Sequence, residues 1–257
     1  MPQGLGMQLG LGGGRSATAS GSPAAGGLVN LVAVDLDGAS DYMDCGDSND
    51  LSFGDGSSDS AFSLSMWVFM DATSNFRGMA KSSATTTEYF LGLNTSSQVV
   101  FACMDDTLSH QISIRGNTGL STSTWYNITG TYDGSGSNTG MTLYVNGDTP
   151  ASTRASAGSY VAMHNSSGAL RVGSWEDLGS FGNGKIDEPA VFPSELSAAQ
   201  VAAIYNDKVA VSLAPFSPTS WWRMGDIVDS TGTDIPDQRV AANDGTLSAS
   251  GLYTTTF

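Results

Sequence analysis

The chain has 257 residues, and its 25 acidic against 10 basic side chains give a formal net charge of −15. A surface this acidic repels phosphate backbones and anionic lipid headgroups, which excludes nucleic acid and membranes as favoured partners. No apolar run reaches the roughly 20 residues that cross a bilayer, and residues 1–27 lack the features of a signal peptide, so we expect a protein made in a cytoplasm. Cys45 and Cys103 form no CxxC motif, and we expect two partly buried free thiols rather than a disulfide.

Apolar residues alternate with glycine and glutamine near the N-terminus. This period of two predicts a strand with one apolar face, formed by Leu5, Met7, Leu9 and Leu11. Glycine loses much conformational entropy in a strand, so we expect the segment to order as a docking arm on the sheet edge of a partner. The alternative is an unstructured tail. The Gly-, Ser- and Ala-rich stretch that follows is typical of a flexible linker.

From Leu28 onward, short apolar segments alternate with turn-rich stretches about every ten residues, which is the pattern of an all-β domain. The expected strands lie at residues 28–38, 61–70, 88–94, 98–104, 125–132, 141–147, 169–175 and 185–192. Asn146-Gly147 predicts a tight hairpin turn, because both positions of a type I′ turn need a positive φ. Such strands pack as two antiparallel sheets that face each other across a shared core.

One short helix is predicted after the last of these strands. Ser197 suits the N-cap position, and Gln200 completes a capping box three residues later. Val201, Ile204 and Tyr205 then form a one-sided apolar stripe. A helix this short is marginal alone, so we expect it to pack over an open edge or end of the sandwich.

Five sequence stretches follow one another in an order that is typical of one protein family: DLDGASDYMDCG (35–46), FSLSMWVFM (62–70), WYNITGTYDG (125–134), LYVNG (143–147) and GKIDEPAVFPSELSAAQVAAIYN (184–206). Together they resemble the laminin G-like, concanavalin A-like jelly-roll domains, over about residues 31–207. Asn127 stands where histidine is usual in that family. The resemblance implies an all-β, two-sheet antiparallel jelly-roll sandwich with one short helix, to which the N-terminal pattern adds an extended arm.

The segment SWWRMGDIVDSTGTDIPDQRVAANDGTLSASG (220–251) resembles stretches that accompany such domains in tailed-phage virion proteins, particularly of marine phages. This implies a virion structural protein, a capsid decoration, fibre or tail-associated component made in the host cytoplasm. It implies a homo-oligomer in the particle that contacts other virion proteins through residues 1–14. We expect Trp221 and Trp222 to pack a β-extension onto the sandwich rather than to stack on a sugar.

These features divide the chain into three parts. Residues 1–27 form the docking arm and linker, residues 28–208 the jelly roll, and residues 209–257 a C-terminal β-extension on the jelly roll or on a neighbour. The alternative function is an adhesin that binds a host surface polysaccharide. An exposed aromatic platform beside carboxylates or amides would mark that function. Its candidate residues are Trp175, Phe181 and Tyr160, and the alternative for each of them is a place in the core.

The sequence does not indicate an enzyme. Glycosidases of related jelly rolls use two carboxylates that flank the scissile bond, and the chain has no Glu-x-Asp-x-Glu strand. Asp187 and Glu188 are neighbours, so on a regular strand they point to opposite faces and cannot act on one substrate. There is no G-x-S-x-G nucleophile motif.

Calcium is the predicted cofactor. Asp35, Asp37 and Asp41 lie within one turn, and carbonyl groups around Gly38 offer further oxygen ligands of the kind that Ca²⁺ prefers. The resemblance to jelly-roll domains adds Asp187 of the closing strand to this set. The alternative is that these aspartates cap turns through hydrogen bonds to their own backbone.

Overall fold

A computed structural model describes residues 28, 30–73, 75–105, 109–175, 180–226, 232–239, 241–249 and 252–255. All of the strand pairs among them are antiparallel. Within this part of the chain, no helix has the length and apolar character that crossing a membrane requires. Cys45 and Cys103 are both buried and form no disulfide, as the sequence predicts.

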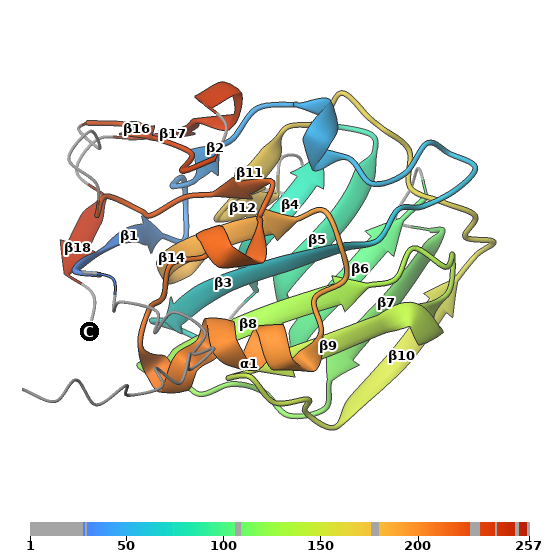
Figure 1. The fold of residues 1–257 in the computed structure, drawn as a ribbon, viewed down its shortest axis with the longest axis horizontal. Coiled ribbons are helices and arrows are strands. Elements are labelled where there is room, and N and C mark those ends of the chain that lie inside the picture. Colours follow the sequence, from blue (N-terminus) through green and yellow to red (C-terminus); the bar gives the residue numbers. More distant parts are fainter. Residues whose placement is uncertain are drawn as a thin grey trace, which may run out of the picture.

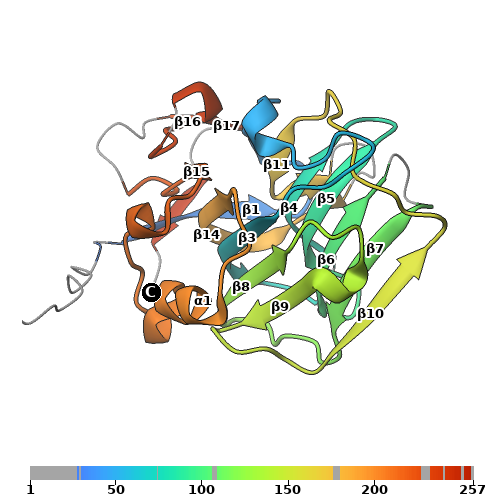
Figure 2. The ribbon, with the colours of Figure 1, turned by 45° about the vertical axis from the view of Figure 1, so that its right-hand side comes forward.

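Two sheets form the sandwich (Figures 1 and 2). Among the described residues, sheet A has seven strands: β18 (Tyr253–Thr255), β1 (Val32–Asp37), β14 (Asn183–Phe192), β3 (Phe62–Met70), β8 (Trp125–Tyr132), β9 (Met141–Val145) and, paired with β14, β15 (Ser220–Trp221). Sheet B has nine: β10 (Ser152–Ala157), β7 (Gln111–Gly116), β6 (Val99–Met104), β5 (Thr87–Leu93), β4 (Phe76–Ser82), β11 (Leu170–Val172), β2 (Met43–Asp44), β17 (Gly245–Leu247) and β16 (Asp234–Ile235). The predicted jelly-roll sandwich is therefore confirmed.

Shorter elements connect and cover these sheets. The strands β12 (Ser174–Trp175) and β13 (Ser180–Phe181) pair with each other beside β4. The single α-helix of the described residues is α1 (Ala198–Tyr205). The 3₁₀ turns are η1 (Asn49–Leu51), η2 (Asn138–Gly140), η3 (Asn206–Lys208), η4 (Ala214–Phe216) and η5 (Ala241–Asn243).

The core lies between the sheets and follows the period of two along β3. Phe62, Leu64 and Met66 are completely buried in the core cluster, together with residues of sheet B. The alternate residues of β3, such as Trp67, face outward, where Trp67 contacts Tyr205 of α1 at 5.8 Å between ring centroids. The helix thus covers the outer face of sheet A (Figure 2). Because both faces of β3 are covered, its sequence is apolar nearly throughout.

The C-terminal segment contributes to both sheets. β15 pairs with β14 and β18 pairs with β1 in sheet A, while β17 pairs with β2 in sheet B. Trp222 is fully buried in the core, and its Nε1 donates to the carbonyl of Asn243 at 2.8 Å. The described part of residues 209–257 therefore completes the sandwich of the same chain.

Two local predictions are confirmed at the turn and the helix. Asn146 and Gly147 have φ of 53° and 81°, and the flanking residues Val145 and Asp148 form an antiparallel bridge. At α1, the Ser197 side chain accepts from the Gln200 backbone N–H while the Gln200 side chain accepts from the Ser197 backbone N–H. The capping box predicted from the sequence is therefore present.

Replacing Ser197 by alanine is expected to lower the free energy of unfolding by about 1 kcal/mol, because the helix loses its N-cap acceptor. Urea denaturation of the purified protein measures this loss. Ser194→Ala is the matched control, since it removes an exposed hydroxyl ahead of the helix without changing the cap. An equal effect of the two substitutions would contradict a specific role for the cap.

Candidate functional site

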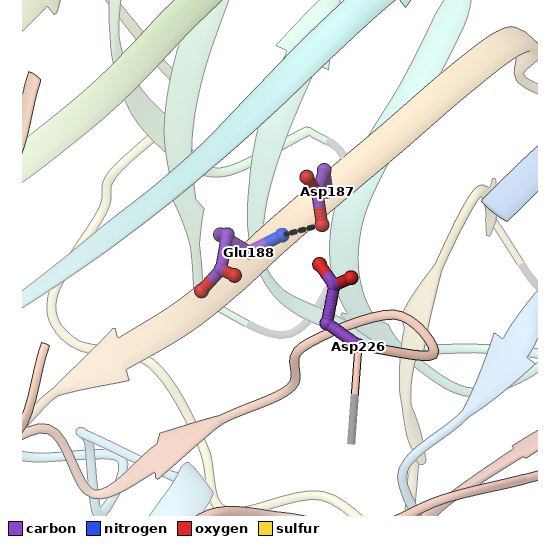
Figure 3. A group of neighbouring side chains, drawn as sticks. All are labelled: Asp187, Glu188 and Asp226. Atoms are coloured by element: carbon purple, nitrogen blue, oxygen red, sulfur yellow. Dashed lines mark hydrogen bonds between the residues drawn. The ribbon is translucent and has the colours of Figure 1, made fainter. Parts of the chain in front are cut away.

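A β-bulge in β14 brings two neighbouring carboxylates to one side of sheet A. Asp187 pairs with Trp67 and Ala190 pairs with Ser65, so two residues of β14 lie opposite one residue of β3. Glu188, within this bulge, has a φ of 50°, in the left-handed region. A carboxylate oxygen of Glu188 lies within 4.8 Å of one from Asp187, and the Glu188 backbone N–H donates to Asp187 Oδ1 at 2.9 Å (Figure 3). The sequence argument that these neighbours point to opposite faces is therefore wrong, because it assumed a regular strand.

Asp226 adds a third carboxylate from the C-terminal segment (Figure 3). Ligand oxygens of Asp187, Glu188 and Asp226 all lie within 4.8 Å of one another, and we call these residues the carboxylate cluster. Asp226 Oδ1 accepts from the backbone N–H groups of Leu31 and Val32, at 2.8 and 3.1 Å. The cluster therefore joins the start of β1, the closing strand and the C-terminal segment.

Further polar groups surround the carboxylate cluster. The Asn30 amide donates to Asp187 Oδ2 at 2.8 Å, and the Trp221 indole N–H donates to Glu188 Oε2. Arg223 lies 3.4 Å from Glu188 Oε1 and 3.9 Å from Asp226 Oδ2. The guanidinium thus pairs with two of the three carboxylates, and the cluster with Arg223 carries two negative charges when all three carboxylates are ionised.

Burial determines how these carboxyl groups titrate. Removal from water raises the pKa of Asp187 well above its usual value, and the neighbouring Glu188 raises it further. Burial also raises the pKa of Glu188 to about 7, although the Arg223 guanidinium opposes that shift. A buried group of like charges is unfavourable unless it takes up protons or a cation. The carboxylate cluster therefore has the charge and the oxygen donors of a cation site.

The predicted acidic turn uses its carboxylates differently. Asp37 Oδ1 accepts from the backbone N–H groups of Ala39, Ser40 and Asp41, and these hydrogen bonds lower the pKa of Asp37 to about 2. Asp41 in turn accepts from the Asp37 N–H at 3.0 Å. Asp37 and Asp41 therefore cap their own turn through hydrogen bonds to the backbone, which is the alternative to calcium binding that the sequence offers.

The structure does not place the four predicted calcium ligands in one group. Asp35 lies 3.5 Å from the Lys185 ammonium. Of the four aspartates, Asp187 alone belongs to the group of three acidic residues found among the described residues. Glu188 and Asp226 were missed. Glu188 was missed because a bulge cannot be read from the sequence, and Asp226 because it lies 39 positions after Asp187 in the chain.

Two of the three predicted aromatic platform residues pack or hydrogen-bond within the domain and do not form an open platform. Trp175 is 8% exposed, stacks on Phe90 at 5.1 Å between centroids, and donates from Nε1 to the Thr87 hydroxyl. The hydroxyl of Tyr160 donates to the half-buried carboxylate of Asp59 at 2.6 Å. These contacts cover sheet B and fasten a loop, so neither ring is an open platform.

The third, Phe181, lies in a different environment. Its ring is half-buried and 6.5 Å from that of Tyr42. The Arg171 guanidinium lies 4.7 Å from the Tyr42 ring centre, and its Nε is 3.4 Å from Asp44 Oδ2. We call Tyr42, Asp44, Arg171 and Phe181 the Tyr42 patch. Residues 42 and 44 are two apart and share a face, which is the sequence signal that could have found it.

The register places the Tyr42 patch at the outer face of sheet B. Arg171 pairs with Ala80, Ala80 with Phe90, and Phe90 with Ala102. These last three residues form a small apolar cluster outside the main core. The patch thus offers apolar ring faces beside a charged donor and a charged acceptor, which suits a ligand with an apolar face and a polar rim.

The predicted docking arm, with Leu5, Met7, Leu9 and Leu11, lies outside the described residues. Its docking on a partner therefore stays a prediction.

Comparisons with known proteins agree with this architecture. Residues 37–202 match the Laminin_G_3 family model, described as the concanavalin A-like lectin/glucanases superfamily. A candidate carbohydrate-binding protein from Bacteroides ovatus has a similar structure, with a TM-score of 0.59 and 16% identity over 89% of this chain and 60% of that chain. The CBM40 domain of the Ruminococcus gnavus IT-sialidase, solved with α2,3-sialyllactose, aligns with a TM-score of 0.50 and 10% identity, over 67% of this chain and 97% of that one. No curated protein matches the sequence.

Proposed function

The chain belongs to the concanavalin A-like lectin/glucanase superfamily, and from this premise we propose that it is a glycan-binding protein. The observation that carries the proposal is the Tyr42 patch on the outer face of sheet B. Two proteins of similar fold are described as a candidate carbohydrate-binding protein and as a domain bound to a sialylated sugar, which supports the proposal. This is the adhesin function that the sequence offers as an alternative.

The chemistry of the Tyr42 patch suits a sugar. A pyranose ring has an apolar C–H face that packs on an aromatic ring, and hydroxyl groups around its rim. Arg171 offers guanidinium donors to such hydroxyls, and Asp44 offers carboxylate acceptors. Their mutual contact at 3.4 Å holds both groups beside the rings before a ligand arrives. Such preorganisation lowers the entropy cost of binding.

Tyr42→Ala and Phe181→Ala are each expected to weaken glycan binding about tenfold, because each removes a stacking surface worth about 1 kcal/mol or more. A glycan array identifies the ligand, and isothermal titration calorimetry measures the affinities. Trp125→Ala is the control, since this half-buried ring lies on sheet A beside Phe69. Failure of the wild-type protein to bind any glycan would refute the function, and unchanged affinity of both variants would refute the site.

We propose a virion as the setting of this binding. The resemblance of residues 220–251 to segments of tailed-phage virion proteins supports it. Immunogold labelling of purified particles with an antibody against the jelly roll tests the proposal. Labelled particles would support a receptor-binding component, whereas unlabelled particles would separate the glycan-binding function from a virion.

We also propose that the carboxylate cluster holds Ca²⁺. The donors fit this ion, because Asp187, Glu188 and Asp226 supply hard carboxylate oxygens. Asp226 Oδ2 is buried and accepts no hydrogen bond from the described residues. The two negative charges left after pairing with Arg223 match a divalent cation. The ion would neutralise these charges. It would also link the C-terminal segment, through Asp226, to Asp187 and Glu188 of β14.

A further inference from the structure

Arg77 of β4 lies between two aromatic rings on the outer face of sheet B. The centre of its guanidinium is 5.3 Å from the Phe90 ring centroid and 4.9 Å from that of Trp175. Its Nη2 donates to the Ser180 hydroxyl at 3.4 Å, a long hydrogen bond. Its Nε is buried and has no hydrogen-bond partner in the part of the chain that the structure describes. The rings therefore fix the position of the guanidinium. Among the described residues, its one hydrogen bond is the long bond to Ser180.

Among the described residues, this cation also differs from its neighbours in having no carboxylate at ion-pair distance. Carboxylates lie within 4 Å of Lys81, Arg171, Lys185 and Arg223. No carboxylate of the described residues makes an ion pair with Arg77, although the chain has 25 acidic side chains. Burial lowers the pKa of Arg77, which reflects the loss of water around its charge. A desolvated cation without an anion is unfavourable, and a bound anion would offset that cost.

Arg77 adjoins the Tyr42 patch through the chain. Ser180, which accepts its hydrogen bond, precedes Phe181 of the patch in β13. In addition, Arg171 of the patch lies on β11, the strand that pairs with β4. Two of the ten basic side chains therefore flank the aromatic rings on one face of an otherwise acidic protein.

We propose that Arg77 anchors an anionic group of the bound glycan, so that the ligand class is an acidic glycan carrying a carboxylate or a sulfate. The inference rests on the proposed glycan-binding function. The planar guanidinium matches either group through two parallel N–H donors, and the rings on both sides fix its plane. Neutral sugars would leave this cation without a partner.

A matched-pair glycan array tests the inference. The pairs are sialyllactose with lactose, oligogalacturonate with its methyl ester, and sulfated with unsulfated galacto-oligosaccharides. We expect each acidic ligand that binds to bind at least about tenfold more tightly than its neutral partner, as a charge-assisted hydrogen bond predicts. The galacturonate and sulfate pairs distinguish the two anionic groups. Equal binding within every pair would overturn the inference while leaving the proposed function intact, whereas binding of no glycan would overturn both.

Substitutions at position 77 test whether Arg77 causes the preference for acidic over neutral ligands. Arg77→Met keeps an unbranched apolar side chain between the rings and removes the charge, so it should erase the difference within a pair. Arg77→Lys keeps the charge without the planar fork and should restore part of it. Arg115→Met, at an exposed arginine of β7, is the control and should leave the preference unchanged. A folded Arg77→Met protein that still prefers the acidic ligand tenfold would refute the role of Arg77.

Discussion

Replacing Lys81 by methionine is expected to destabilise the protein by about 3–5 kcal/mol, because it leaves a buried carboxylate without its partner. Lys81 and Glu88 are 0% and 1% exposed, and Lys81 Nζ lies 3.4 Å from Glu88 Oε1. The same ammonium donates to Asp47 at 2.5 Å and to the Gly168 carbonyl at 2.6 Å. The substitution therefore removes two hydrogen bonds and the ion pair with the buried Glu88 together.

The loss should depend on pH. Burial raises the pKa of Glu88, and the Lys81 charge opposes that shift, so the substitution raises the pKa further. A carboxyl group whose pKa is higher in the folded state costs little stability below its unfolded pKa and costs more as the pH rises through the folded value. The difference in stability between wild type and Lys81→Met should therefore grow from pH 4 to pH 8.

Urea denaturation at several pH values measures this effect, and two further variants make it specific. Adding Glu88→Gln to Lys81→Met should recover part of the loss, because it removes the unpaired charge. Lys185→Met is the control, since Lys185 pairs at 3.5 Å with the exposed Asp35; a surface pair contributes about 1 kcal/mol or less. Equal losses for the two single variants at pH 8 would show that the Lys81 network is not important for stability.

Calcium is expected to raise the melting temperature, and Asp187→Asn to abolish that rise. Ligand at 100 times its dissociation constant stabilises a protein by about 2.7 kcal/mol. For a chain of this size that corresponds to roughly 5–10 °C. Without calcium, Asp187→Asn should itself be neutral or stabilising, because it removes one of three buried like charges. The substitution thus has opposite effects in the two conditions.

Differential scanning calorimetry in excess Ca²⁺ and in EDTA measures both effects. Asp37→Asn is the matched control, because its carboxylate serves the exposed turn at β1 and lies outside the carboxylate cluster. This variant should keep the full response to calcium. An unchanged wild-type midpoint would refute the calcium site, and loss of the response in Asp37→Asn would move the site to the first acidic turn.

The sequence predicts those parts of the fold where local pattern and burial agree. The first half of β3 alternates between apolar residues and serine, the Asn146-Gly147 turn needs its two positive φ values, and α1 has a complete cap. β4, β7 and β10 were not predicted. β10 (STRASA) has small polar residues and lies exposed at a sheet edge, so no apolar period marks it. Tertiary pairing rather than side-chain pattern defines such a strand.

The sites are harder to predict because they depend on contacts between distant segments. A bulge reverses the expected direction of Glu188, and pairing of the chain ends brings Asp226 to β14. Trp175 has the residue type of a sugar platform, yet its ring packs on Phe90. The spacing of Tyr42 and Asp44 was readable from the sequence, but their partners Arg171 and Phe181 lie more than 100 residues away.

The position of β1 between β14 and β18 has a consequence for biosynthesis. Val34 pairs with Ile186 on one side and with Tyr253 on the other, so both neighbours of the first strand are made about 150 residues or more later. At a typical rate of chain elongation that interval is roughly 8–30 s. During this time the strand has neither ladder partner, which exposes an apolar segment to other nascent chains. Folding should therefore be slow and largely post-translational, and sensitive to chaperone supply.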